Sequence, residues 1–461
     1  MDKNEYFGSL SVGLPADIER RRQHGDYGGA IRLIDRRLSE DLPEALRRCL
    51  IVEREILLRT PRDYPYDREQ ALAVIRADIP GLTEEEFDEL VDARRIDWIY
   101  VNGEERYIRS FYGTLCKAYP DFAARAGRGD RAEKRNAEGL TEKQVIGREI
   151  DAMRRNGSSS WRIRMRASIR VRDGSFVPGA RLRAWLPIPS PAARQISDVE
   201  ILSCGAPCVI APEDAPQRTA FFEDAPRENR TFFVEYAFTN TVSYTDAYGG
   251  KGAPGTPGTD LGEIPPHIVF TPYIRFLAES LTAGRKEPLD KARSIYDFIT
   301  KNVRYSFMRE YFCLENISES AARDLRGDCG VQALLFITLC RCAGVPARWQ
   351  SGRTASPMDT GMHDWAEFWA EPYGWLFADP SFGGGAFRNG DEERRRFYFG
   401  NLDPFRMAAN TAFQQPFMPP STQWRRDPYD NQAGEMETEE GPLTQEDTVR
   451  ETVVLSCEKI R

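Results

Sequence analysis

Apolar residues recur at helical spacing among many Arg and Glu between residues 18 and 58, a pattern typical of antiparallel helices in a small bundle or repeat. A later helix start is marked by Thr83, a good N-cap, and by Glu86, which closes a capping box. Alternating residues then flank Asn102-Gly103, the strongest short-range signal for a β-hairpin. The pattern therefore predicts a mostly helical domain over residues 1–155 that contains a helix followed by a hairpin.

From Trp161 onward the apolar period changes from helical to two, as in β-strands. Short alternating segments separated by Pro, Gly and Asp are typical of an antiparallel β-sandwich, which we predict over residues 156–248. A stretch rich in Gly and Pro, residues 249–266, follows as a linker or long loop. The strands predicted in the sandwich are 161–171, 181–188, 198–203, 219–223 and 231–242.

Helical spacing returns after this stretch and gives way to strands beyond Pro346. We interpret residues 265–420 as the core that carries the chemistry and residues 421–461 as a C-terminal extension with a final strand. The helices predicted in the core are 272–282, 289–303 and one that follows Gly327-Asp328-Cys329. The whole chain is predicted to be an α+β protein.

Composition and charge narrow the function. The chain has 461 residues, 41% of them hydrophobic, and a net charge of −8, which indicates several globular domains without a global basic field. The helix and hairpin of the N-terminal domain resemble a winged helix, but the acidic surroundings favour a packing module, so no nucleic acid partner is expected.

Compartment is predicted from the cysteines and the apolar runs. No apolar run reaches the roughly 18 residues of a membrane span, and the N-terminus lacks the apolar region of a signal peptide. Nine cysteines, an odd number, fit reduced thiols in a cytoplasm better than a disulfide framework. A cytoplasmic protein with no membrane partner is expected, and the sequence predicts no oligomeric state.

Cys329 is the first candidate for chemistry. Asp328 is a plausible N-cap that places Cys329 in the first turn of a helix that is apolar almost all round. Unpaired N–H groups and the macrodipole at a helix N-terminus favour the thiolate, and the same N–H groups could stabilise an oxyanion. The charge of Asp328 opposes this effect unless its carboxylate is occupied in capping. The alternative is a buried structural thiol, which is what most cysteines are.

His363 and Asp379 form the second candidate. Only three histidines are present, His24, His267 and His363, and the first and second of them lie in a polar turn and a Pro-rich linker. Strands are predicted on both sides of a turn at Pro372-Tyr373-Gly374. If that turn is centred near residue 371, His363 and Asp379 lie opposite each other on one face, as a nucleophile–base–orienter triad with Cys329 requires. A shift of one residue would separate them.

Other motifs do not predict a metal or a cofactor. Cys204 and Cys208 have no further Cys or His pair nearby, and the glycines at 249–252 lack the spacing of a phosphate loop. The glycine run 383–385 is interpreted as a flexible rim loop beside the triad.

Taken together, the core resembles the transglutaminase-like superfamily of papain-fold cysteine enzymes, over residues 287–379. The matching features, besides the apolar helix, are Gly327-Asp328-Cys329-Gly330, Gly344-Val345-Pro346-Ala347-Arg348, His363-x-Trp365-x-Glu367, Gly374-Trp375 and Asp379-Pro380. Segments 348–352 and 398–405 are similar to a bacterial branch of uncertain substrate, and Ser381 stands where the family usually has Thr.

The resemblance implies roles for individual residues. Cys329 would be the nucleophile, His363 the base and Asp379 the orienting carboxylate. A side-chain oxyanion donor is also implied, for which Tyr305 is the leading candidate and Tyr311 competes, against core or rim packing for either. Trp349 could line the acyl-donor groove, or belong to the core.

These residues predict a cysteine-dependent amide-bond hydrolase, a protease, amidase or deamidase, that acts on a peptide or protein substrate through a thioester. The same triad would serve a protein-glutamine transamidase, because the acceptor, water or amine, is chosen by the groove. An alternative from another class is a non-catalytic scaffold or binding protein with a transglutaminase-like core.

Overall fold

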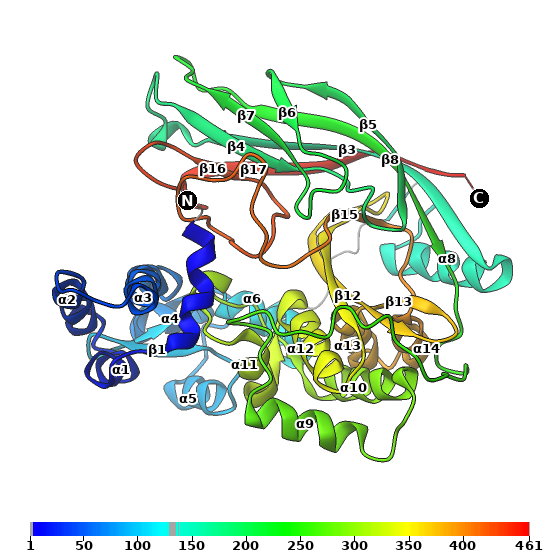
Figure 1. Cartoon of the computed structure of the whole chain (residues 1–461), viewed down its shortest axis with the longest axis horizontal. Coiled ribbons are helices and arrows are strands. Elements are labelled where there is room, and N and C mark those ends of the chain that lie inside the picture. Colours follow the sequence, from blue (N-terminus) through cyan, green and yellow to red (C-terminus); the bar gives the residue numbers. More distant parts are fainter. Residues whose placement is uncertain (1–2, 129–134, 137, 461) are drawn as a thin grey trace.

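The computed structural model describes residues 3–128, 135–136 and 138–460. The chain is an α+β protein, as predicted, with a helical N-terminal part, a β-sandwich and a mixed core (Figure 1). In Figure 1 the sandwich lies across the top, the N-terminal helices α1–α5 lie at the lower left, and the core helices α9–α14 lie below the sandwich. No helix in these described residues has the length and apolar character needed to cross a membrane.

The N-terminal part contains the predicted helix and hairpin. Thr83 caps α5 in a full capping box with Glu86, and Asn102 and Gly103 form the hairpin turn with φ of 51° and 91°. Positive φ at both positions is what a tight hairpin turn requires, which explains Asn-Gly there. The elements are η1 Lys3–Val12, α1 Ala16–Gln23, α2 Tyr27–Leu38, α3 Glu44–Asp63, α4 Arg68–Arg76, α5 Glu84–Asp92, β1 Trp98–Val101, β2 Glu104–Tyr107, α6 Phe111–Ala118, α7 Pro120–Arg125 and α8 Glu142–Asn156.

The sandwich consists of two four-stranded antiparallel sheets, ordered β16-β4-β7-β6 and β17-β3-β8-β5. Phe222 of β7 and Phe232 of β8 pack across it with ring centroids 5.5 Å apart. The strands are β3 Ser158–Val171, β4 Leu182–Pro187, β5 Ile196–Cys204, β6 Cys208–Ile210, β7 Thr219–Asp224, β8 Phe232–Ser243, β16 Glu435–Glu437 and β17 Thr448–Lys459. The predicted C-terminal extension contains its final strand, β17, and both β16 and β17 pair at the edges of the two sandwich sheets.

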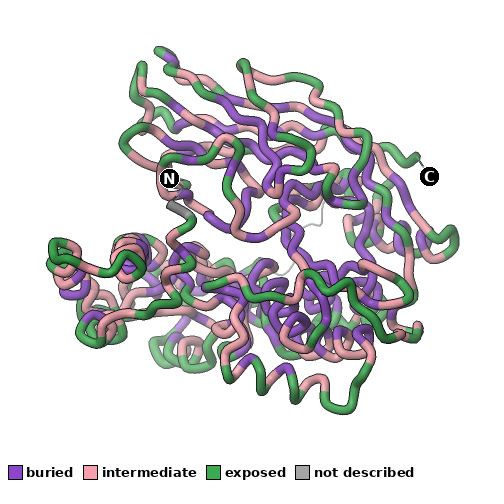
Figure 2. The backbone as a smooth tube through the Cα atoms, viewed as in Figure 1, coloured by how far each residue is buried: buried purple, intermediate pink, exposed green. Residues whose placement is uncertain are grey.

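The core is a five-stranded antiparallel sheet, ordered β14-β13-β12-β11-β15, with helix α12 packed on it. Residues 330–341 of α12 are all buried, and Figure 2 shows the core sheet and this helix as buried chain. The elements are α9 Pro272–Thr282, α10 Pro288–Asn302, β9 Arg304–Tyr305, η3 Tyr311–Cys313, α11 Ile317–Asp324, β10 Arg326–Gly327, α12 Cys329–Cys342, β11 Ala347–Thr354, β12 Met362–Ala370, β13 Gly374–Ala378, α13 Pro380–Arg388, α14 Glu392–Phe397, β14 Phe399–Gly400 and β15 Arg406–Asn410.

The sandwich and the core share one continuous hydrophobic cluster. Strand β15 joins them, since Ala408 O accepts from Ser190 N at 2.8 Å and Ala409 O accepts from Arg218 N at 3.0 Å. Burial of a large apolar side chain contributes about 1.5–3 kcal/mol, so this shared cluster holds the core sheet firmly against the sandwich.

The glycine run 383–385 lies inside helix α13, so its interpretation as a rim loop is wrong. A Cβ on Gly383 would stand 1.9 Å from Tyr296 Oη. Glycine is therefore required there because α13 packs closely against α10, and not because the chain must be flexible.

Candidate active site

Cys329 opens helix α12, as the sequence predicts. Asp328 is the N-cap, and its Oδ1 accepts from Val331 N at 3.2 Å. The Tyr311 hydroxyl donates to the same Oδ1 and accepts from Val331 N at 3.1 Å. The carboxylate of Asp328 is therefore occupied in capping, and Tyr311 is a part of that cap.

Position 330, directly after Cys329, requires glycine. A Cβ on Gly330 would lie 2.4 Å from Tyr311 Oη and 2.9 Å from Asp364 Oδ2. This close approach brings strand β12, which carries His363 and Asp364, against the first turn of α12, which begins at Cys329.

His363 and Asp379 lie on one face of adjacent strands. The ladder between β12 and β13 is centred on Pro372 rather than near Glu371, so Asp379 falls opposite Trp365 and not opposite His363. A displacement by two positions keeps the side chains on the same face. His363 Nε2 and Asp379 Oδ2 are 2.7 Å apart, with both side chains buried.

The carboxylate of Asp379 is held by two further groups. Its Oδ1 accepts from Phe382 N at 2.9 Å as the N-cap of α13, and its Oδ2 lies 3.0 Å from Arg406 Nη1. The guanidinium of Arg406 also pairs with Asp403 at 2.6 Å. Although burial opposes ionisation, the interaction with His363 and the charge of Arg406 hold the pKa of Asp379 below its ordinary value.

The imidazole of His363 is neutral at rest. Burial lowers the pKa of His363, although Asp379 opposes this shift. Because Nε2 faces the ionised Asp379, it carries the proton, which leaves Nδ1 as the acceptor. Phe382 fixes the ring, with centroids 4.2 Å apart.

The thiol of Cys329 differs from expectation. Burial first, then the charges of Asp364 and Asp328, raise the pKa of Cys329 well above its ordinary value. The expectation that the helix N-terminus yields a thiolate is therefore wrong for this resting state, because the two carboxyl groups and burial outweigh the helix dipole. Sγ donates to Asp364 Oδ2 at 3.1 Å, and no hydrogen bond between Cys329 and His363 is present among the described residues.

Asp364 belongs to a buried group of carboxyls that the sequence did not reveal. Its Oδ1 accepts from Gln432 Nε2, and it shares a hydrogen bond with Asp430. Burial and then the charge of Asp430 raise the pKa of Asp364 well above its ordinary value. Asp430 and Gln432 come from the segment that carries the last strands, so the C-terminal part of the chain reaches Asp364, the partner of Cys329.

Cys329, His363 and Tyr305 line one open cleft of about 710 Å³. Tyr305 is opposite Gly327 in the short parallel ladder of β9 and β10, two residues before Cys329, and both Tyr305 and Cys329 line the cleft. The charge of Cys329 adds to burial in raising the pKa of the Tyr305 phenol. Of the two candidate tyrosines, only Tyr305 faces the cleft among its described lining, whereas Tyr311 caps the helix.

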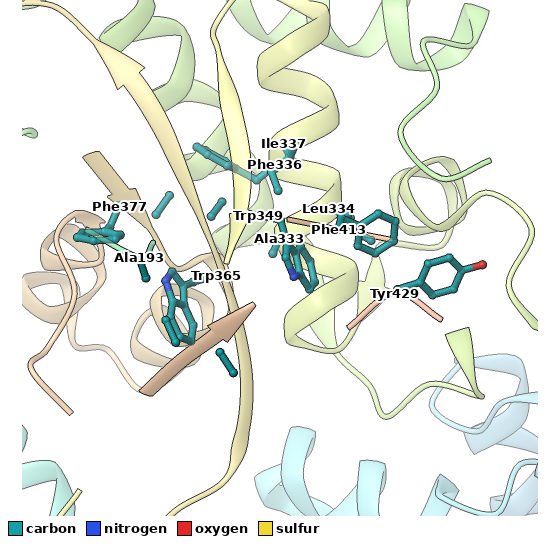
Figure 3. Close-up of a cluster of buried hydrophobic side chains, with 14 of the residues drawn as sticks. Ala193, Ala333, Leu334, Phe336, Ile337, Trp349, Trp365, Phe377, Phe413 and Tyr429 are labelled. Atoms are coloured by element: carbon teal, nitrogen blue, oxygen red, sulfur yellow. The ribbon is translucent and has the colours of Figure 1, made fainter. Parts of the chain in front are cut away.

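Trp349 lies in the core and not in the cleft. It is 3% exposed, and its ring packs edge to face on Phe413 with centroids 5.3 Å apart. Figure 3 shows Trp349 between the α12 side chains Ala333 and Leu334 and the ring of Phe413. Of the two alternatives for Trp349, the structure agrees with core packing and gives a groove role no support.

Glu367 is a second buried anchor. Its carboxylate is fully buried and pairs with Arg194 at 2.7 Å and Arg348 at 2.8 Å. Because Arg194 belongs to the sandwich, Glu367 ties strand β12 to that domain. No group of three or more His, Cys, Asp and Glu in the described part of the chain is arranged to hold a metal ion.

Residues 275–380 match the family model of the transglutaminase-like superfamily. The chain carries a transglutaminase-like domain. The matched range begins in α9 and ends just after Asp379, so it includes Cys329 and His363 as well. No curated protein was found to match the chain.

Solved structures similar to this chain are distant from it in sequence. A proposed cysteine protease from Cytophaga hutchinsonii has a TM-score of 0.43 at 15% identity, over 66% of this chain and 91% of that one. The periplasmic domain of TgpA from Pseudomonas aeruginosa has a TM-score of 0.28 at 15% identity, over 54% of this chain and 96% of that one. A proposed protease from Parabacteroides distasonis has a TM-score of 0.21 at 10% identity, over 49% and 60%.

Proposed function

We propose that this protein is a cysteine-dependent amide hydrolase that acts on peptide or peptide-like substrates through a thioester acyl-enzyme. The observation that carries the proposal is the buried His363–Asp379 hydrogen bond of 2.7 Å, whose imidazole opens into the cleft that Cys329 lines. A base that is oriented by a carboxylate and lies beside a thiol is the arrangement that nucleophilic catalysis requires.

The first half of the reaction begins with a neutral thiol and a neutral imidazole. The Cys329 side chain rotates away from Asp364, and its proton passes to Nδ1 of His363, while Nε2–H continues to donate to Asp379. The thiolate then attacks the amide carbonyl, and the negative charge develops on the carbonyl oxygen. Tyr305 is our candidate donor to that oxygen, since it lines the cleft and its hydroxyl makes no hydrogen bond within the described residues.

The second half uses the same histidine. The His363 imidazolium gives its proton to the leaving amine, the C–N bond breaks, and the acyl group remains on sulfur as a thioester. Burial lowers the pKa of His363, which makes its imidazolium a stronger acid for this step. Water, deprotonated by His363, then hydrolyses the thioester and restores the thiol.

The test is a library of peptide amides, scored for hydrolysis and for incorporation of a primary amine. We expect hydrolysis to exceed amine incorporation and to vanish in Cys329→Ala. Cys342→Ala is the matched control, because Cys342 is a half-buried thiol at the far end of the same helix. Turnover that survives in Cys329→Ala would overturn the proposal, and amine incorporation in excess of hydrolysis would make the protein a transamidase of the same triad.

The cytoplasm is the compartment that we propose. All nine cysteines are free thiols, and burial raises the pKa of several, including Cys49 and Cys313. Free thiols in this number suit a reducing compartment. Fractionation of the cells that make the protein tests this proposal. We expect the protein in the cytoplasmic fraction, and its recovery from an oxidising compartment would contradict the proposal.

A further inference from the structure

Three cations from separate elements stand around the nucleophile in the cleft. Lys117 comes from α6 in the N-terminal part, Arg304 from β9, and Arg388 from the end of α13. The N-terminal helices therefore form one wall of the cleft, and the core forms the other.

These cations lie close to Cys329 and to one another. Lys117 Nζ is 3.8 Å from the ring centroid of Tyr305, which in turn is paired with Gly327, two residues before the nucleophile. Burial lowers the pKa of Lys117, and the charge of Asp328 opposes this shift. Arg388 Nη1 donates to Val303 O at 3.4 Å, next to Arg304.

None of the three cations has an ion-pair partner within the described residues; their contacts are to rings and a carbonyl oxygen. Two carboxyls beside Cys329 are already engaged by the protein, since Asp328 caps α12 and Asp364 accepts from the thiol. A cation without a counter-ion in a cleft is available to an anionic ligand.

The other end of the cleft is balanced in charge. Lys143 lies 3.9 Å from Asp391, and Arg394 lies 4.0 Å from the same carboxyl. Glu142 accepts from Ser356 Oγ at 2.6 Å. The excess of positive charge is therefore confined to the end that holds Lys117, Arg304 and Arg388, in a chain whose net charge is −8.

We propose that this end of the cleft selects a substrate that carries a carboxylate next to the scissile amide, held by Lys117, Arg304 and Arg388. The inference rests on the proposed function for the amide, and it gives the helical N-terminal part a role in substrate selection. The carboxylate could be an acidic side chain or a free C-terminal carboxylate, because both present the same charged oxygens to Lys and Arg.

The first experiment does not depend on turnover. Iodoacetate and iodoacetamide alkylate the same thiol and differ in one carboxylate, so their rate ratio at Cys329, divided by the ratio for free cysteine, reports the charge that the cleft prefers. The rates are measured on the Cys329 peptide by mass spectrometry. The normalised ratio should fall about tenfold in Lys117→Gln and in Arg388→Gln, the size of effect of one charged hydrogen bond. Lys301→Gln, an exposed helical lysine outside the cleft, should leave it unchanged.

High salt should lower the same ratio in the wild type and change it little in Lys117→Gln, because screening acts on the charge interaction. Equal normalised ratios in Lys117→Gln, Arg388→Gln and Lys301→Gln would overturn the inference. The ratio cancels any change in the thiolate fraction of Cys329, because both reagents react with the same thiolate. A thermal melt of each variant serves as the folding check.

The second experiment uses two pairs of peptide amides. One pair compares Glu with Gln beside the scissile bond, and the other compares a free C-terminal carboxylate with its carboxamide. We expect kcat/KM to favour the carboxylate in one pair by about tenfold, and that pair identifies its source. Cleavage of all four peptides without preference would overturn the inference while leaving the hydrolase proposal standing. A charge-dependent alkylation ratio without cleavage of any peptide would support the anion site and contradict the hydrolase proposal.

Discussion

Asp364→Asn should make Cys329 a stronger acid. In the wild type the thiol donates to Asp364 Oδ2 at 3.1 Å. Ionisation of Cys329 therefore places a thiolate next to this carboxyl group, and an ionised carboxylate repels the thiolate. At this separation two full charges repel by about 5 kcal/mol with an effective dielectric constant of about 20, which corresponds to a ceiling of about 4 pKa units.

The expected shift is smaller than this ceiling. Burial and Asp430 raise the pKa of Asp364, so this carboxyl is protonated for part of the time and then does not repel the thiolate. Burial and Asp328 also continue to act on Cys329 after the substitution. We therefore expect the pKa of Cys329 to fall by at least about one unit, with the thiol still above its ordinary value.

The assay is the rate of Cys329 alkylation by iodoacetamide from about pH 6 to about pH 11, followed on the Cys329 peptide. Asp391→Asn is the matched control, because Asp391 lines the same cleft and caps α14, a role that Asn also fulfils. A midpoint in Asp364→Asn that equals or exceeds the wild-type value would refute the reasoning. An equal fall in Asp391→Asn would assign the effect to the charge of the whole cleft.

Three further outcomes follow from single contacts. Tyr305→Phe should lower kcat by about 10²-fold with little change in KM, and an unchanged kcat would remove Tyr305 as the oxyanion donor. Glu53 has a pKa raised by burial from 4.5 to about 7, so its contribution to stability is present below about pH 4.5 and lost as pH rises through about 7. Glu53→Gln should therefore stabilise the protein at pH 8 by about 1–3 kcal/mol in urea unfolding and change little at pH 4, whereas a loss of stability at pH 8 would contradict this sign. Gly330→Ala should destabilise by about 1–3 kcal/mol, because its Cβ would stand 2.4 Å from Tyr311 Oη, while Gly385→Ala, with no atom within 4 Å, should be stabilising or neutral in the same thermal melt.

Local patterns predicted the elements well. The strand predicted over 161–171 is β3, and the helix predicted over 272–282 is α9 with the same bounds, because alternation and helical spacing are properties of short segments. The same reasoning located Cys329 at a helix start and put His363 and Asp379 on one face. The predicted pairing of β12 with β13 was wrong by two residues, and a shift of two residues leaves the side chains on the same face of the sheet.

Long-range contacts could not be predicted in this way. Arg406 contacts Asp379 from strand β15, and helices α13 and α14 lie between the two residues in the sequence. Asp430 contacts Asp364 from the segment that leads to the last sandwich strands. A buried carboxylate needs a counter-ion, but the residue that supplies it depends on the packing of the sheet and was not predicted. The pKa of Cys329 was mispredicted for the same reason, because the residues that raise it are set by tertiary contacts.

Trapping the acyl-enzyme tests the central claim most directly. A peptide aryl ester is mixed with the protein, quenched in acid within the first turnovers, and the intact mass and the site of the adduct are measured. The account predicts a mass increase equal to the acyl group, located on Cys329, present in Cys342→Ala and absent in Cys329→Ala. Turnover without an adduct on Cys329, or an adduct on another residue, would contradict it.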